Sequence, residues 1–121
     1  MAFAVEIMQG GLSAGTADAL NGGANTTLSA AGTTQGTATA IKTSNTIVST
    51  VASGAGVILP AGQQGDWGVI YNGGANALTV YPPTGAKINQ VATNSGITLG
   101  TNTACIFSCF SSTQWIANLS A

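Results

Sequence analysis

Residues 66–81 read Asp-Trp-Gly-Val-Ile-Tyr-Asn-Gly-Gly-Ala-Asn-Ala-Leu-Thr-Val-Tyr, and this stretch indicates the kind of fold. Trp67, Val69 and Tyr71 occupy alternate positions, which places them on one face of a strand because successive strand side chains point to opposite faces. The Asn-Gly pair that follows accepts positive φ and is a strong hairpin signal. We therefore expect residues 77–81 to return as the paired strand.

Short segments rich in β-branched and aromatic residues recur on both sides of this stretch. The further expected strands are residues 46–51, 57–59, 87–89, 97–99, 103–110 and 114–119. Strands this short, with turns about every 8 to 12 residues, are typical of sandwiches and barrels. The predicted fold class is all-β, as a small β-sandwich, a jelly-roll-like module or a barrel. The strand over 103–110 is apolar on both faces and is predicted to be central, with Trp115 and Ile116 closing the core.

The first forty residues differ from the rest, because the large apolar residues cluster after residue 41. The chain is therefore divided into an extended N-terminal arm rich in Gly, Ala and Thr, residues 1–40, and a β domain, residues 41–121. Within residues 22–40, Leu28 is the one large apolar side chain. A flexible linker and a segment that becomes ordered against a neighbouring subunit both fit this composition.

Two short patterns precede that tract. Phe3, Val5 and Ile7 alternate with smaller or polar residues, which predicts a short strand or extended arm. One interpretation of residues 13–20 is a short helix that begins at Ser13 and presents Leu20 on a narrow apolar stripe. Such a short helix is marginal alone and needs a surface to lie on.

The chain carries very little charge for its 121 residues. Its charged side chains are two lysines and three acidic residues, it has no His, and its net charge is −1. The carboxylates Glu6, Asp18 and Asp66 are far apart in sequence, so neither a carboxylate pair nor an imidazole is available for acid–base chemistry. We expect a protein that is not an enzyme and holds no cofactor, with Asp66 capping the turn before Trp67. A protein this near neutrality tends to associate.

Composition also argues against two kinds of partner. Lys42 and Lys87 cannot form a basic patch, so nucleic-acid binding is not expected. No apolar run reaches the roughly 18 residues of a membrane helix, and the N-terminus lacks the basic residues of a secretory signal. We expect a soluble, unprocessed chain.

Cys105 and Cys109 are the only cysteines. Four residues apart on a strand, they share one face at a separation of roughly 13 Å, whereas a disulfide needs Cα atoms within about 7 Å. We expect two buried thiols in a reducing compartment. A metal site would require further ligands and is not expected.

Trp67, Tyr71 and Tyr81 surround the expected hairpin. Packing in the core and at its rim explains them, and so does a contact patch, because Tyr and Trp are enriched at interfaces. A carbohydrate-stacking site is a third interpretation.

Several stretches carry a resemblance to a known group of proteins. They are Gly-Val-Ile-Leu-Pro at 56–60, Gly-Asp at 65–66, Tyr-Asn-Gly-Gly-Ala-Asn-Ala-Leu-Thr-Val-Tyr-Pro-Pro-Thr-Gly-Ala-Lys-Ile-Asn at 71–89 and Phe-Ser-Cys-Phe-Ser-Ser-Thr-Gln-Trp at 107–115. Gly-Leu-Ser-Ala-Gly-Thr-Ala at 11–17 and Ala-Ala-Gly-Thr-Thr-Gln-Gly-Thr-Ala at 30–38 belong with them. The chain resembles small virion proteins of tailed bacteriophages, some of which look like capsid decoration, or cement, proteins. The resemblance implies a β-rich module, commonly trimeric, on the outside of a shell, and it transfers no site residues.

The function expected from these features is a non-enzymatic decoration protein that clamps subunits of the major capsid protein on the outer surface of a virion. Its expected partners are its own copies, as a homotrimer, and the major capsid protein. The alternative is a carbohydrate- or host-binding module of a head fibre or tail fibre. The candidate assembly contacts are Phe3, Val5, Ile7, Leu20, Leu28, Trp67, Tyr71 and Tyr81.

Overall fold

The structure is a computed structural model that describes residues 22–120. Its strands are β1 (Ala24–Ala30), β2 (Thr39–Ala40), β3 (Asn45–Val51), β4 (Gly56–Ile58), β5 (Trp67–Asn72), β6 (Leu78–Tyr81), β7 (Lys87–Ile88), β8 (Ile97–Leu99), β9 (Ala104–Ser111) and β10 (Gln114–Leu119). A single 3-10 turn, η1 (Gln35–Thr37), is the one helical element among the described residues. The predicted all-β class is confirmed, and the helix considered for residues 13–20 lies outside the described part.

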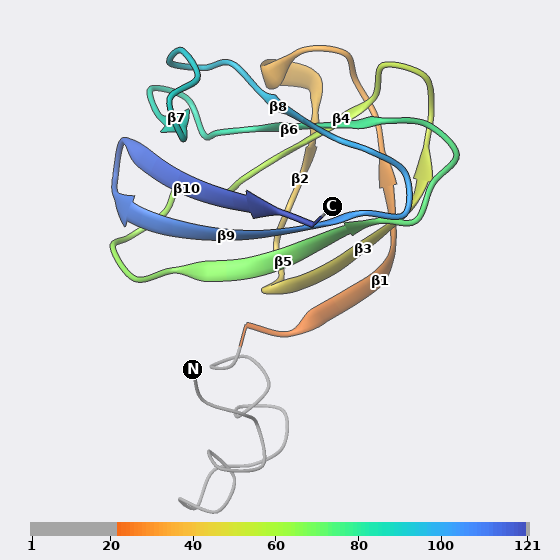
Figure 1. Ribbon diagram of the computed structural model, residues 1–121, viewed down its shortest axis with the longest axis horizontal. Helices are drawn as coiled ribbons and strands as arrows, with labels where there is room; N and C mark the ends of the chain where they lie inside the picture. The colour runs from red at the N-terminus through yellow and green to blue at the C-terminus, as the bar shows by residue number, and fades with distance from the viewer. Residues whose placement is uncertain (1–21, 121) are drawn as a thin grey trace, which may run out of the picture.

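The strands form two layers, which Figure 1 shows one above the other. Sheet A has six strands in the order β1-β3-β5-β9-β10-β7, and sheet B has four in the order β2-β4-β6-β8. Apolar side chains between the layers form one core.

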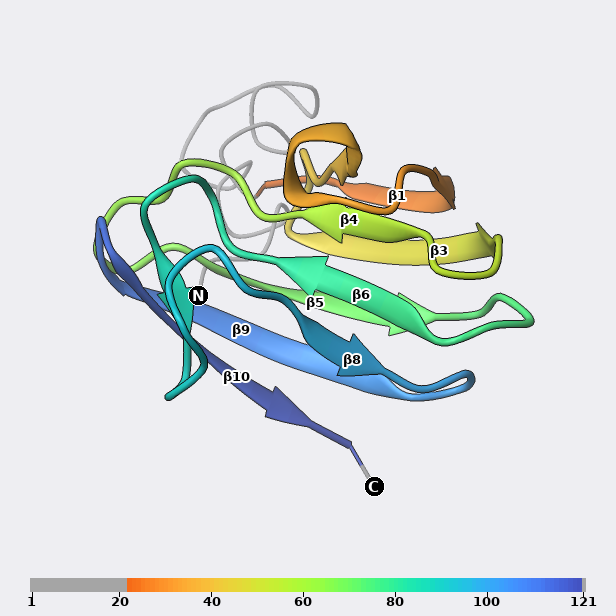
Figure 2. The ribbon, with the colours of Figure 1, turned by 90° about the horizontal axis from the view of Figure 1, so that it is seen from above.

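The first six strands alternate between the two sheets as the chain advances. β1, β3 and β5 pair in parallel in sheet A, and β2, β4 and β6 pair in parallel in sheet B. Each consecutive pair is therefore one coil of a solenoid-like stack: coil 1 is β1 and β2, coil 2 is β3 and β4, and coil 3 is β5 and β6. Figure 2 shows β3 beside β5 in sheet A and β4 beside β6 in sheet B. The sandwich, jelly roll or barrel expected from the sequence is not confirmed.

The predicted hairpin at residues 72–76 is wrong. β5 lies in sheet A and β6 in sheet B, so the Asn-Gly-Gly segment turns a corner between the layers. The side chain of Asn72, which is completely buried, determines this corner. Its amide nitrogen donates to the carbonyls of Asn76 and Leu99 at 2.9 and 3.0 Å, and its oxygen accepts from the N–H of Gly74 at 3.0 Å. Gly73 and Gly74 do not have positive φ, so the corner does not use the left-handed conformation that makes Asn-Gly a hairpin signal.

The chain after coil 3 reverses direction and closes that end of the stack. β8 pairs antiparallel with β6, and β9 pairs antiparallel with β5 and β10. β9 lies between β5 and β10, which confirms its predicted interior place in the sheet.

Inward-facing side chains stack from coil to coil. Thr46 of β3 pairs with Ile70 of β5, which pairs with Cys105 of β9, and all three are buried. Sheet B contributes the aligned pair Val57 and Val80. Continuous ladders of this kind exclude water along the stack, and each fully buried aliphatic side chain contributes about 1.5–3 kcal/mol.

Trp115 fills the C-terminal end of the core, as predicted. It is 1% exposed, and its ring centroid lies 5.6 Å from that of Phe107. Ile116 was expected to join it but is 39% exposed. Because neighbouring strand residues point to opposite faces, burial of Trp115 sends Ile116 outward.

The boundary expected between residues 40 and 41 is also wrong. Residues 24–30 and 39–40 are coil 1, and they pair in parallel with β3 and β4. The small Ala, Thr and Ser side chains of coil 1 are compatible with strand structure, because β3 and β4 of coil 2 provide hydrogen-bonding partners for its backbone. The β fold thus begins by Ala24.

We predict that Asn72→Ala lowers the free energy of unfolding by about 3 kcal/mol, because it leaves buried backbone groups without partners. Urea unfolding followed by circular dichroism measures this loss. The matched control is Asn118→Ala, at an exposed position of β10, which should change stability by less than about 0.5 kcal/mol. Equal effects from the two variants would contradict a structural role for the corner.

Candidate assembly surface

The described residues bring no reactive side chains together. Asp66 is the single carboxylate residue between residues 22 and 120, and its Oδ2 accepts from the N–H of Gln63 at 2.9 Å. This contact confirms the predicted turn cap. Within the described part, no group of three or more His, Cys, Asp or Glu residues could hold a metal ion.

The most distinctive surface is the outer face of sheet A, which points away from sheet B. We define it by the outward apolar side chains of β3, β5, β9 and β10: Ile47, Trp67, Val69, Tyr71, Ile106, Phe110 and Ile116. The strand register brings them together. Val69 pairs with Ile106, Ile47 pairs with Tyr71, and Trp67 and Ile116 flank Ser108 in one row.

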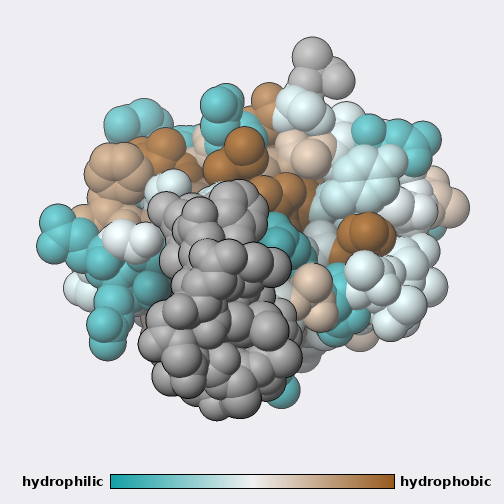
Figure 3. Space-filling view, turned by 90° about the horizontal axis from the view of Figure 1, so that it is seen from below, coloured by the Kyte–Doolittle hydropathy of each residue, from teal (hydrophilic) through white to brown (hydrophobic). Residues whose placement is uncertain are grey.

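Several of these side chains are exposed to an unusual degree for their size. Ile47 is 38% exposed, Ile106 is 51%, Phe110 is 60% and Ile116 is 39%. Trp67, Val69 and Tyr71 are half-buried between them. In Figure 3, brown apolar residues gather on this face among pale and teal ones.

No charged residue interrupts the outer face. The remaining outward positions on β3, β5, β9 and β10 hold Asn, Ser, Ala and Gln. A contiguous exposed apolar patch with a polar margin is characteristic of a surface that contacts another macromolecule. An uncharged face of this kind is suited to contact through shape and the burial of apolar area.

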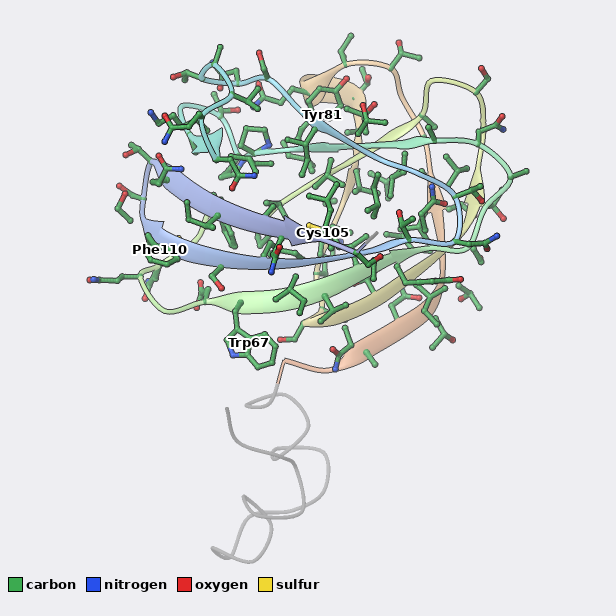
Figure 4. The ribbon with its side chains drawn as sticks, in the orientation of Figure 1. Trp67, Tyr81, Cys105 and Phe110 are labelled. Atoms are coloured by element: carbon green, nitrogen blue, oxygen red, sulfur yellow. The ribbon has the colours of Figure 1, made fainter. Side chains whose placement is uncertain are left out.

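The structure separates the three aromatic residues that the sequence placed around one hairpin. Trp67 and Tyr71 share the outer face of sheet A, where the Tyr71 hydroxyl lies 3.4 Å from Oδ1 of Asn102. Tyr81 belongs to sheet B, and its hydroxyl donates to the carbonyl of Thr33 at 3.1 Å. Figure 4 shows Trp67 and Tyr81 on opposite sides of the molecule. A single patch of all three is therefore wrong.

Leu28 lies apart from both groups. It is half-buried on β1 and packs against the core from coil 1. Phe3, Val5, Ile7 and Leu20 lie outside the described residues.

Sequence reasoning missed most of the outer face. Ile106 and Phe110 stand on β9, which is apolar at nearly every position, and this pattern by itself predicts a central strand with both faces buried. The alternation of Cys105, Phe107 and Cys109 with Ile106 and Phe110 contained the signal, because one of the two sets had to point away from the core.

A second feature is a cavity at the start of the stack, here called the end cavity. Its volume is about 300 Å³, and it is lined by Asn25, Leu28, Thr39, Ala40, Lys42, Thr43 and Thr46. These residues come from β1, β2, the connection between β2 and β3, and the beginning of β3. Ala40 and Lys42 are exposed, so the cavity is an open hollow at the coil 1 end of the stack.

The two cysteines are free and buried, as expected. Burial raises the pKa of the Cys105 thiol to about 11, although a hydrogen bond with the backbone of Asn118 opposes the shift. Burial also raises the pKa of Cys109, with a smaller contribution from the negative charge of Asp66. Thiols held in the neutral form are poor nucleophiles, so both serve as small apolar core residues.

No protein-family model matches this chain, and no curated protein matches it in sequence. Between residues 22 and 120, no helix has the length and apolar character to cross a membrane. What the protein does is therefore inferred from its own surfaces.

We predict that stability falls as the pH rises from about 9 to about 11. In this window the unfolded chain ionises Cys105 while the folded chain keeps the thiol protonated, so the free energy of unfolding decreases by at most about 1.4 kcal/mol per pH unit for this group. Urea unfolding across the window measures the slope. Cys105→Ala should flatten it, and parallel slopes for the two proteins would show that Cys105 is not responsible.

Proposed function

We propose that this chain is a non-enzymatic structural protein of a tailed-bacteriophage particle, which decorates the capsid and clamps subunits of its major capsid protein. The observation that carries the proposal is the uncharged, apolar outer face of sheet A, with Ile106 and Phe110 more than half exposed. The sequence resemblance to small virion proteins supplies the phage context. On this proposal the protein acts on the outer surface of the capsid.

The binding energy comes from burial of the outer face. Removing apolar surface from water yields about 25 cal/mol per Å², and large aromatic anchors concentrate this gain in a few side chains. Trp67 and Phe110 are the aromatic anchors on this face. The lack of charge avoids the cost of desolvating ions between packed subunits.

The protein is proposed to work as a homotrimer. The near-neutral net charge opposes association only weakly, and a closed ring of copies would cover exposed apolar surface on each one.

A glycan-binding module of a head or tail fibre is a second candidate. It is favoured by Trp67 and Tyr71, which stand half-exposed on one face of one strand, beside the side-chain amide of Asn102. Aromatic rings with neighbouring amides offer both stacking and hydrogen bonding to sugars. This candidate requires those two rings but not Ile106 or Phe110.

For the decoration role we predict that Ile106→Thr combined with Phe110→Thr weakens binding to shells lacking the protein at least tenfold, as measured by co-sedimentation. Both changes retain a strand-compatible residue and remove apolar area. The matched control is Leu119→Thr. Leu119 is 41% exposed, but its position on β10 alternates with that of Ile116, so it does not belong to the outer face. Unchanged binding by the double variant would overturn the proposal. The second candidate would be favoured if the protein binds glycans on an array and this binding is lost with Trp67→Ala and Tyr71→Ala but not with the Ile106→Thr, Phe110→Thr variant.

For the oligomer we predict a trimer in sedimentation equilibrium at micromolar concentration. The Ile106→Thr, Phe110→Thr variant separates two arrangements. If it becomes monomeric, the outer face joins copies to one another, and if it stays trimeric, that face is free for the shell. A monomer for the unmodified chain would rule out the homotrimer.

A further inference from the structure

The solenoid-like stack has two different ends. At the C-terminal end, β8 pairs antiparallel with β6 and β9 pairs antiparallel with β5 and β10, while β7, which pairs in parallel with β10, is the outermost strand of sheet A. At the other end, β1 and β2 are the outermost strands of their sheets. Repeating stacks need a different terminal element that covers the last interior layer. Coil 1 has no such cover among the described residues.

The end cavity is the interior surface that such a cover would meet. Leu28 supplies an apolar wall and packs against the core, and Thr39, Thr43 and Thr46 surround it with hydroxyl groups. Lys42 is the one charged residue of the lining. The cavity therefore suits one medium-sized apolar side chain followed or preceded by a carboxylate.

The edge of β1 is poorly suited to another β-strand. The N–H of Thr27 donates to Oδ1 of its neighbour Asn25 at 3.0 Å. The hydroxyl of Thr39 accepts from the N–H of Ala31 and donates to the carbonyl of Ser29, both at 3.0 Å. The pairing of β1 with β3 also shifts register twice near Leu28. Used hydrogen-bonding groups and bulges prevent strand addition, which argues against a second copy continuing the stack.

The chain itself enters beside the cavity. The carbonyl of Gly22 accepts from the N–H of Ser44 at 2.8 Å, and that of Gly23 accepts from Asn45 at 3.2 Å. Gly22 is therefore tied next to Lys42 and Thr43, two residues of the cavity lining. Leu20 is two residues upstream, a reach of about 7 Å, and Asp18 is four residues upstream, a reach of about 14 Å. An apolar residue and a carboxylate of the preceding chain are therefore close enough to Gly22 in sequence to reach the end cavity.

We propose that residues 12–21 of this chain cap the stack, with Leu20 inserted into the end cavity and the Asp18 carboxylate beside the Lys42 ammonium group. The segment complements the cavity in size, polarity and charge, and it needs no strand pairing with β1. This cap is independent of where the protein works, so it stands or falls apart from the decoration role.

A disulfide test identifies the occupant. In the Leu20→Cys, Ala40→Cys variant, the new cysteines should lie within bonding distance, because Ala40 lines the cavity and the cap would bring residue 20 to it. Mild oxidation should then give an intramolecular disulfide in most of the protein. The control pair is Leu20→Cys with Ala52→Cys, an exposed residue beyond the far end of β3. A disulfide-linked dimer would show that a second copy fills the cavity, and no disulfide, or equal yield in the control pair, would overturn the cap.

A stability test in the otherwise unaltered full chain provides a second measurement. Leu20→Ser should lower the Tm by at least about 4 °C, because it removes an apolar side chain from the interior. Val5→Ser, the same kind of change outside residues 12–21, should leave the Tm within about 1 °C. If Leu20→Ser behaves like Val5→Ser, residue 20 is not buried and the proposal is wrong.

Discussion

Five hydrogen bonds converge on Asn72 at the junction between the parallel coils and the antiparallel C-terminal strands. Its side chain bonds to Asn76, Leu99 and Gly74. Its backbone N–H donates to the carbonyl of Thr103 at 2.9 Å, and its carbonyl accepts from the N–H of Asn102 at 2.8 Å. A buried amide is costly unless all its groups are paired. Gly74 and Asn76 lie between β5 and β6, whereas Leu99, Asn102 and Thr103 lie at the end of β8 and in the turn that follows it, so the positions of these two segments are coupled through this one residue.

Neighbouring contacts extend this junction into coil 2. The side-chain amide of Asn76 donates to the carbonyl of Val51 at 2.9 Å, and the hydroxyl of Thr101 donates to the carbonyl of Gly74. A side chain at Gly74 would collide with Val51, so glycine permits the close approach of the two coils. The corner between sheets A and B thus aligns coil 3 on coil 2, and the interior ladders follow from that alignment.

The same alignment creates the outer face of sheet A. Once Cys105, Phe107 and Cys109 point into the core, Ile106 and Phe110 must point out, since the side-chain period of a strand is two. Burial of Trp115 similarly exposes Ile116. With a net charge of −1 over the whole chain, little electrostatic repulsion keeps such faces apart. The apolar surface is therefore a direct consequence of how the core is filled.

The sequence by itself determined the all-β class, most strand positions, the buried thiols and the turn cap at Asp66, because these depend on local alternation and local hydrogen bonding. It did not determine which strands are neighbours. The segment at 72–76 carries the backbone freedom of a hairpin, yet whether it reverses the chain within one sheet or passes it to the other depends on Asn72 meeting Leu99, 27 residues away. Coil 1 is similar: residues 24–40 hold few large apolar side chains, and they become β1 and β2 only because β3 and β4 offer them parallel partners. Non-local pairing therefore decided the stack, its open end and the face that β5, β9 and β10 expose, since the free energy of those contacts exists only after distant segments have come together.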